Sequence, residues 1–362
     1  MKQYDYYIGL DWSQAKMALA ISQKGSDESR IVELDSDVRR LKYLLKSLKG
    51  TKILTLEEST ASQWLWVELH DYADEIIVCD PYHNFLLSSG PKNDRIDASK
   101  LLELLRGGLL KPVFHSSADF MQYRSLLGTY TDLVKTGVAW KNRLGAQQRA
   151  RAGENAGSEE EVFCGAVAEY IIEYYEIFKK SFEDRFREIV KKSKVMSSLT
   201  RIPGIGIIGA FKIGAIVVDA GRFKTKGHFL SYCGLIKHKK MSGGRSYGSR
   251  SPRKSSLPAA APTVYCIVGA AALPRCNRTL KSVFKTAAFS CAYGRGENSM
   301  KDYFNSLISK GKPVHAARHM VARKIAATAL AIMKSGMQYN STEVRKYVGG
   351  REVDLAGKES RA

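Results

Sequence analysis

The sequence lacks any apolar run of roughly 18 residues, the length that a membrane-spanning helix needs. Its first residues, MKQYDYYIGLDW, contain no apolar segment followed by a small-residue cleavage site, so we expect a cytoplasmic protein with no membrane partner. The six cysteines never form a CxxC pair, which argues against a zinc knuckle and against a thioredoxin-type redox motif. In a reducing compartment they are expected to be free thiols.

Acidic residues are missing from the long stretch between Ala220 and Gly296, although fifteen Lys and Arg residues occur there. The whole chain of 362 residues has a formal net charge of +21, so this stretch supplies most of the excess. A solvated basic face usually has interspersed acids, so this pattern favours a polyanionic partner, by default a nucleic acid. A basic surface that only keeps the protein soluble is the alternative.

The N-terminal part of the chain alternates strand and helix patterns. Three β-rich runs joined by short polar links predict antiparallel hairpins, and helices then alternate with two further strands. The predicted strands are Tyr4–Leu10, Met17–Ser22, Ile31–Leu34, Ile53–Leu56 and Ile76–Val78. The predicted helices run from a cap at Asp35 or Ser36 to Leu48, over Gln63–Tyr72 and over Asp94–Arg106. This order predicts a mixed sheet covered by helices.

Beyond Pro112 the strand pattern disappears, and Asp119–Arg151 and Val162–Lys194 are predicted as two antiparallel helices. The second helix has an apolar stripe with steps of three and four residues, typical of a coiled-coil seam. The stripe consists of Ile171, Tyr175, Phe178, Phe182, Phe186 and Ile189. It packs either on the protein's own domains or on a second copy of the chain.

Four regions follow from these patterns. Residues 1–112 form a mixed α/β domain, and residues 113–195 form a helical oligomerisation region. Residues 196–335 form a basic domain, rich in Gly and Ala, that ends in the helical pattern His315–Met333. Residues 336–362 have no sustained periodicity and are expected to be a flexible tail.

Acidic residues occur where predicted strands of the first domain end and its last helix begins. Asp11 closes the first strand, Glu57 and Glu58 close the fourth, and Asp94 and Asp97 open the last helix. Asp94 and Asp97 share a helix face, although Asp94 alone could be only a helix cap. Carboxylates this close repel one another unless cations lie between them, and Mg²⁺, with Mn²⁺ as the alternative, suits such oxygen ligands. Two such ions about 4 Å apart could act on a phosphodiester.

Three segments of this domain, GLDWSQAKMALAI, LEESTASQW and NDRIDASKL, resemble those of the IS110 family of DEDD transposases, which includes the pilin-gene invertases. The resemblance continues, in family order, through LTRIPGIGIIGAFKIGAIV, GRFKTKGHFLSYCGLIKHKKMSGGRS and SLISKGKPVHAARHMVARKIAA. It implies an α/β fold, an RNase H-like (RuvC-like) mixed sheet with flanking helices, followed by an all-α part. That part comprises a coiled-coil arm and a mainly helical basic transposase domain.

The resemblance also implies which residues form the DEDD tetrad, namely Asp11, Glu58, Asp94 and Asp97. Glu58 is preferred to Glu57 because Glu58-Ser59-Thr60-Ala61 matches the family's Glu-x-Thr-Gly element, with Ala61 in place of glycine. The spacing of the residues alone does not decide between the two glutamates.

A second landmark of the resemblance is Ser242 in the segment MSGGR, which corresponds to a serine that becomes joined to DNA through a 5′-phosphoserine link. A serine hydroxyl is a poor nucleophile until a base or a metal activates it, and Lys239, Lys240 and Arg245 could offset phosphate charge. From composition alone, a Gly/Ser/Arg run is more often a flexible nucleic-acid-binding loop. The family pattern is lost after Arg250, where SPRKSSLP intervenes.

The turn Ile202-Pro203-Gly204-Ile205-Gly206 resembles a helix-hairpin-helix, in which the amides of Gly204 and Gly206 would contact a backbone phosphate. A Pro-Gly turn that only ends a helix is the alternative. The other predicted nucleic-acid contacts are Lys237, Lys239, Lys240, Arg245, Arg250, Arg253 and Lys254.

Together these features predict a transposase or site-specific recombinase of an insertion sequence, which cuts and rejoins double-stranded donor and target DNA at the nucleoid of a prokaryote. The resemblance implies a structured guide RNA, the bridge RNA, and assembly as a dimer and, on DNA, a tetramer. Two other classes remain open. A hydrolytic RuvC-like junction resolvase would need the four carboxylates but not Ser242, and a non-catalytic nucleic-acid-binding protein would be indifferent to metal removal.

Overall fold

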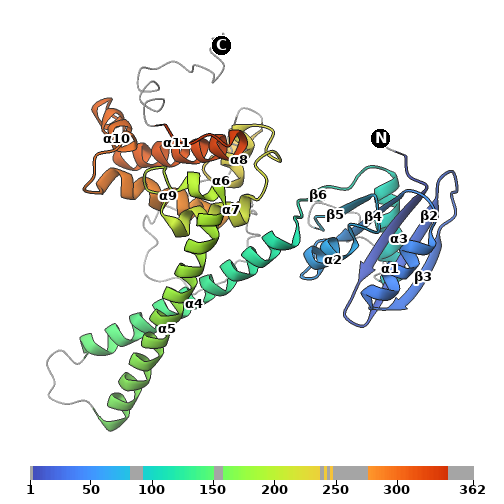
Figure 1. Ribbon diagram of the computed structural model, residues 1–362, viewed down its shortest axis with the longest axis horizontal. Helices are drawn as coiled ribbons and strands as arrows, with labels where there is room; N and C mark the ends of the chain where they lie inside the picture. The colour runs from blue at the N-terminus through green and yellow to red at the C-terminus, as the bar shows by residue number, and fades with distance from the viewer. Residues whose placement is uncertain are drawn as a thin grey trace. The chain divides into compact units, whose positions relative to one another are not determined.

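The computed structural model describes residues 3–81, 93–150, 158–236, 240–242, 245–247 and 276–340. The chain divides into two compact units, Met1–Ser125 and Leu126–Ala362 (Figure 1). Within the described ranges, no helix is both long and apolar enough to cross a membrane.

A six-stranded mixed sheet lies at the centre of the first unit, in the order β3-β2-β1-β4-β5-β6. The strands are β1 (Tyr6–Trp12), β2 (Lys16–Gln23), β3 (Arg30–Asp35), β4 (Lys52–Glu57), β5 (Glu75–Cys79) and β6 (Pro112–Val113). The first three strands pair antiparallel, β4 and β5 run parallel to β1, and β6 closes the edge antiparallel to β5. The predicted mixed sheet with flanking helices is confirmed, and it is consistent with an RNase H-like transposase domain.

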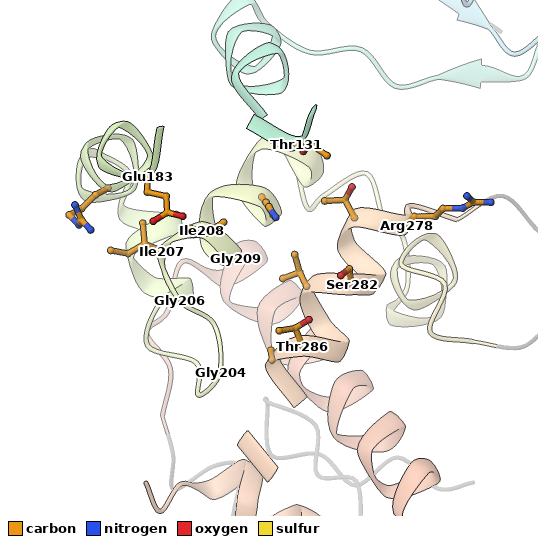
Figure 2. A pocket seen from close by; sticks show the side chains of 15 residues that line it. Thr131, Glu183, Gly204, Gly206, Ile207, Ile208, Gly209, Arg278, Ser282 and Thr286 are labelled. Carbon is orange, nitrogen blue, oxygen red and sulfur yellow. The ribbon is translucent and has the colours of Figure 1, made fainter. Parts of the chain in front are cut away.

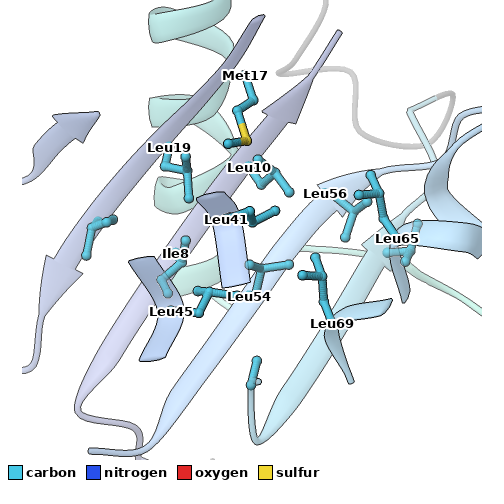
Figure 3. Packing of buried hydrophobic residues seen from close by; sticks show 13 residues of the cluster. Ile8, Leu10, Met17, Leu19, Leu41, Leu45, Leu54, Leu56, Leu65 and Leu69 are labelled. Atoms are coloured by element: carbon cyan, nitrogen blue, oxygen red, sulfur yellow. The ribbon is translucent and has the colours of Figure 1, made fainter. Parts of the chain in front are cut away.

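Helices cover both faces of this sheet, because successive side chains of a strand point to opposite faces. The helices are α1 (Val38–Ser47), α2 (Ser62–Leu69) and α3 (Asp94–Arg106). On one face α1 and α2 pack their leucines on Ile8, Leu10, Leu54 and Leu56, in a cluster that Figure 3 shows. Each side chain buried in this way contributes roughly 1.5–3 kcal/mol to stability. On the opposite face α3 packs on β1 and β2.

Gly9 allows α3 to lie close to β1. A Cβ atom on residue 9 would lie 2.3 Å from the carbonyl oxygen of Ala98 and 2.7 Å from the amide nitrogen of Leu102. Both are backbone atoms of a packed helix, so they cannot move aside as the end of a flexible side chain would. A larger residue at position 9 would therefore displace α3, and with it the acidic first turn of that helix.

Three details of the predicted helices are corrected by the structure. Asp35 pairs with Lys16 in the sheet and the Ser36 amide bonds to the Ala15 carbonyl, so Asp37 is the residue that caps α1. Asn93 caps α3 by accepting a hydrogen bond from the Arg95 amide, which places Asp94 inside the first turn rather than at the cap. The helix predicted to reach Tyr72 ends at Leu69.

The described part of the second unit is helical except for a two-stranded sheet. Its helices are α4 (Ala118–Ala150), which begins in the first unit, α5 (Glu159–Lys192), α6 (Lys194–Leu199), α7 (Ile207–Val217), α8 (Lys226–Tyr232), α9 (Arg278–Tyr293), α10 (Ser299–Ser309) and α11 (Val314–Ser335). The sheet consists of β7 (Lys240–Ser242) and β8 (Arg245–Tyr247). The expectation that no strand follows Pro112 is therefore wrong, because strands of two or three residues are too short to produce a recognisable pattern.

The two long helices α4 and α5 pack antiparallel, as predicted. Tyr130 of α4 contacts Phe182 and Phe186 of α5, and Gly137 of α4 lies against Tyr175. Phe186 also stacks on Phe211 of α7, with ring centres 4.1 Å apart. This part of the predicted stripe therefore packs on the protein's own second unit.

Five cysteines of the described residues are unpaired, as the sequence predicted: Cys79, Cys164, Cys233, Cys276 and Cys291. Burial raises the pKa of Cys233 to about 12 and that of Cys291 to about 11, so both thiols are protonated at neutral pH. Cys266 lies outside the described residues.

Candidate functional site

Asp11 lies at the end of β1, on the face of the sheet that α3 covers. The parallel register of β1 and β4 pairs Leu10 with Leu56, so the next residues, Asp11 and Glu57, end neighbouring strands side by side. Strand alternation places both on the same face as Gly9, which touches α3. The first turn of α3 contains Asp94 and Asp97.

The charges of these acids act on Asp11. Burial raises the pKa of the Asp11 carboxyl to about 6, and the negative charges of Asp94, Asp97 and Glu57 raise it further in the same direction. Three members of the predicted tetrad are thus brought together with Glu57. Lys100, one helical turn along α3, lies 3.4 Å from Asp97 and offsets part of the negative charge.

Glu58 has a different environment. Its Oε2 lies 3.1 Å from Nε2 of His115, a residue whose side chain is only 3% exposed. Burial acts to raise the pKa of Glu58, but the hydrogen bond and charge of His115, with Ser62 and Arg124, outweigh it, and the pKa lies below its ordinary value. Sequence analysis did not identify His115, because one histidine far along the chain from Glu58 leaves no spacing signal.

The acids of this site suit a hard divalent cation in their chemistry. Carboxylate oxygens are preferred ligands of Mg²⁺, and a cation would offset the burial and the neighbouring negative charges that raise the pKa of Asp11. Over the ranges that the structure describes, no group of three or more His, Cys, Asp or Glu side chains is arranged around a single point. The negative charge of the site therefore suits a metal ion. The carboxylates would have to move closer to one another to coordinate it.

Ser242 belongs to the second unit, where it ends β7 opposite Arg245 of β8. Lys240 begins the same strand and pairs with Tyr247. Their backbones belong to the antiparallel pair β7–β8, which includes the predicted nucleophile. The other predicted contacts from this region, Lys237, Lys239, Arg250, Arg253 and Lys254, lie outside the described residues.

The two predicted phosphate-contacting glycines differ in their surroundings. Gly204 has a φ of 82°, and a Cβ atom there would lie 2.4 Å from the carbonyl oxygen of Ala287, so close packing on α9 by itself requires glycine. Gly206 has nothing within 4 Å of that position and begins α7 with no side-chain cap. The first amides of α7 therefore remain available to an anion.

A cavity of about 630 Å³ opens beside this end of α7 (Figure 2). Its wall includes Gly206, Lys212, Arg278 and the hydroxyl-bearing residues Ser282 and Thr286. The cavity combines cations, hydroxyl donors and a helix N-terminus, which are the groups that bind phosphate oxygens in proteins.

Lys212 is the half-buried cation of this cavity. Burial alone lowers the pKa of its ammonium group, and its Nζ lies 5.6 Å from the centre of the Tyr130 ring. Glu183 is an acidic residue of the cavity wall, and its carboxylate accepts a hydrogen bond from the Tyr130 hydroxyl. A desolvated ammonium group gains more from an added anion than an exposed one.

Two family models match the chain over these same regions. Residues 8–147 match a model described as a transposase, the DEDD transposase of the IS110 type, and residues 196–285 match the transposase IS116/IS110/IS902 family. The first match includes all four predicted carboxylates, and the second includes Ser242, Gly204 and Gly206. The chain belongs to the IS110 family of transposases.

Two related proteins show how far the sequence similarity extends. A protein of Streptomyces coelicolor, named as an uncharacterised protein of insertion element IS110, is 24% identical over 163 residues, which cover 45% of this chain and 35% of that protein. The protein y4qE of Sinorhizobium fredii, which carries a transposase name, is 23% identical over 264 residues, covering 68% of this chain and 66% of that protein. The chain thus spans about a third of the length of the Streptomyces protein and about two thirds of the length of the Sinorhizobium protein.

Proposed function

We propose that this IS110-family chain is the enzyme that cuts and rejoins DNA during transposition of an insertion sequence. The observation that carries the proposal is the convergence of charge on Asp11, whose pKa is raised to about 6 by burial and by Asp94, Asp97 and Glu57. Perturbed carboxylates of this kind are typical of catalytic sites. The acid-free basic stretch supports a polyanionic substrate.

The proposed metal is Mg²⁺, or Mn²⁺ in its place, held by Asp11, Asp94, Asp97 and a glutamate at the end of β4. When bound, such an ion polarises a phosphodiester oxygen and stabilises the charge that develops during displacement. The contribution of the chain is to hold these carboxylates on two strand ends and one helix turn. The family resemblance assigns the glutamate as Glu58.

Ser242 is the proposed nucleophile. Its Oγ attacks the scissile phosphorus, so that the Oγ–P bond forms, the P–O3′ bond breaks and a 5′-phosphoserine results. The serine loses its proton to solvent, and the leaving O3′ takes one up and departs as a 3′-hydroxyl. Attack by a 3′-hydroxyl of another strand then restores the phosphodiester and frees the serine. One phosphoester bond replaces another in each step, so rejoining needs no external energy source.

The cavity beside α7 is the proposed contact for a nucleic-acid backbone. Lys212 and the free amides at the start of α7 would bind one phosphate there, in agreement with the helix-hairpin-helix resemblance of the turn. Such a contact carries no sequence information. Recognition of sequence is therefore assigned to a structured guide RNA, the bridge RNA, which would pair with donor and target DNA.

The RNA is tested by expressing the gene with its natural flanking DNA, purifying the protein and sequencing the RNA that accompanies it. One discrete transcript from the flanks is the expected result. Heterogeneous cellular RNA, or no RNA, would overturn the proposal of a guide RNA and favour direct recognition of DNA by the protein.

Assembly with a second copy through α5 is also part of the proposal. Phe163, Val167, Tyr170, Tyr174 and Ile177 are each between 37% and 69% exposed, and they recur in steps of four, three, four and three residues. This spacing forms one continuous seam along the helix, beside the stripe that packs internally. Tyr170→Glu with Tyr174→Glu should convert the dimer to a monomer in light scattering, and an unchanged mass would refute the seam.

The proposed reaction is tested by strand cleavage on DNA containing the element's ends. Asp11→Asn and removal of divalent ions by EDTA should each abolish cleavage, because the metal-binding charge is lost. Asp71→Asn, which changes an exposed acid of the same unit, is the matched control and should cleave normally. Cleavage that survives both Asp11→Asn and EDTA would exclude the proposed site.

A further inference from the structure

His115 is buried between the end of β6 and the start of α2, beside Glu58. Its Nε2 lies 3.1 Å from Oε2 of Glu58 and 3.3 Å from the hydroxyl oxygen of Ser62. Its Nδ1 lies 3.2 Å from the carbonyl oxygen of Val113. The ring is thus held by three polar partners, two from the segment 58–62 and one from Val113, two residues before it.

The partners of His115 fix the direction of its hydrogen bonds. The Val113 carbonyl is only an acceptor, so Nδ1 carries a proton and donates it. The Ser62 hydroxyl has acceptors in the Ser59 carbonyl oxygen and the Glu58 carboxylate, so toward His115 its oxygen can accept. The Glu58 carboxylate is only an acceptor, so Nε2 is the donor in the contact at 3.1 Å.

Further hydrogen bonds hold the segment that contains His115 in place. The Gln63 amide donates to the Ser116 carbonyl at 2.7 Å, and Arg124 donates to the other end of Gln63 at 3.2 Å. The short strand β6 joins this segment to β5, the neighbour of β4. A two-residue strand contributes little to the sheet, but it places His115 beside the end of β4.

We propose that His115 is the positioning residue of the candidate metal site, because it holds the Glu58 carboxylate in one orientation at the end of β4. This inference rests on the proposed function, in which Glu58 is a metal ligand. Carboxylate ligands are commonly oriented by a second hydrogen-bonding group, and loss of such a partner typically weakens metal binding about 10–100-fold. His115 contacts Ser62 and Trp66 of α2, which covers the face of the sheet opposite to α3, so it acts on the site through Glu58.

The test is Mn²⁺ binding to the full chain, measured at equilibrium by electron paramagnetic resonance. His115→Asn keeps an amide near the position of Nδ1 and loses the donor to Glu58, so Mn²⁺ affinity should fall about 10-fold or more. His115→Gln can place its amide nitrogen near the position of Nε2, so its affinity should stay within about threefold of the unaltered chain. The two variants bury similar amides and differ mainly in the bond to Glu58.

A double-mutant cycle separates positioning from a purely structural role. In a Glu58→Gln background, His115→Asn should cause no further loss of Mn²⁺ affinity, because the two residues act as one unit. His115→Met, which removes both donors without adding a polar group, is the second variant should His115→Asn unfold in a thermal melt. Unchanged affinity in both variants, or an equal loss with Glu58→Gln present, would overturn the inference.

Asp11→Asn distinguishes failure of this inference from failure of the proposed function. If Asp11→Asn abolishes Mn²⁺ binding while the His115 variants bind normally, the metal site stands and His115 has no part in it. If the unaltered chain binds no Mn²⁺, or Asp11→Asn binds as well as the unaltered chain, the proposed metal site itself is wrong.

Discussion

Gly9 of β1 and Ala98 of α3 approach so closely that a Cβ atom on residue 9 would lie 2.3 Å from the Ala98 carbonyl oxygen. Gly9→Ala should therefore destabilise the first unit by about 1–3 kcal/mol through overpacking. The measurement is urea unfolding followed by tryptophan fluorescence, since Trp12, Trp64 and Trp66 all lie in that unit.

Gly128→Ala is the control for this substitution. Nothing lies within 4 Å of the Cβ position in Gly128, which is inside α4, so alanine should leave stability unchanged or raise it by about 0.5–1 kcal/mol. Equal stability of Gly9→Ala and the unaltered chain would contradict the close approach of β1 and α3.

The raised pKa of Asp11 predicts how metal binding depends on pH. Protons compete with the metal for this carboxylate, so Mn²⁺ affinity should fall steeply as the pH drops through about 6, well above the ordinary value of 3.8. Titration of Mn²⁺ between pH 5 and 8 measures this dependence. An Mn²⁺ affinity that stays constant between pH 5 and 8 would contradict the raised pKa of Asp11.

The same shift predicts a trend in the stability of the metal-free protein. A pKa raised on folding means that the folded state holds the proton more tightly, so the contribution of Asp11 is present below about pH 3.8 and is lost as the pH rises through about 6. Asp11→Asn should therefore gain stability relative to the unaltered chain between pH 5 and 7.5 in EDTA. Parallel stability curves for the two proteins would refute the shift.

Glu57 and Glu58 are expected to play different parts. Glu57→Gln removes one of the charges that raise the pKa of Asp11, so the pH midpoint of Mn²⁺ binding should move down while strand cleavage persists. Glu58→Gln should abolish cleavage, because the family resemblance places Glu58 in the tetrad. Each variant is the control for the other, and the reverse pattern would transfer the tetrad position to Glu57.

Ser242→Ala should abolish the covalent adduct that survives SDS after incubation with cleavable DNA. Ser246→Ala, which alters a serine of β8 in the same two-stranded sheet, should still form it. Loss of the adduct together with continued strand cutting by Ser242→Ala would favour a hydrolytic resolvase. An adduct that persists in Ser242→Ala would exclude this serine as the nucleophile.

Lys212→Gln should weaken nucleic-acid binding and reduce the slope of log K against log salt by about one, the effect of losing one phosphate contact. Lys135→Gln is the matched control, because Lys135 is an exposed lysine of α4 that pairs with Asp132. Fluorescence anisotropy over a series of salt concentrations measures both slopes. Equal slopes of log K against log salt for the two variants would show that Lys212 does not contact the nucleic acid.

Local sequence signals predicted some elements closely. The helix Asp94–Arg106 has the predicted ends, because Asn93 caps it and an acidic first turn suits the positive end of the helix. The same signals misplaced the cap of α1. Asp35 pairs with β2 and Ser36 bonds to Ala15, so Asp37 caps the helix. Competition for backbone partners from a neighbouring strand is not visible in a local pattern.

The predicted stripe on α5 shows the same limit. Its periodicity is real, but Phe186 is fully buried against Phe211 of α7, whereas Phe178 is 53% exposed. A second seam, which includes Phe163 and Tyr170, faces away from these contacts. Helical spacing shows which residues share a face, and packing decides which face is covered.

The sequence by itself determined the mixed α/β order, the basic character of the second unit and the set of acids that end the strands, because these depend on composition and on neighbours along the chain. Only the tertiary structure placed Glu57 beside Asp11, turned Glu58 toward His115 and packed Ala98 on Gly9. The physical reason is that strand register and helix packing join residues far apart in sequence, and each such contact depends on all the others being made.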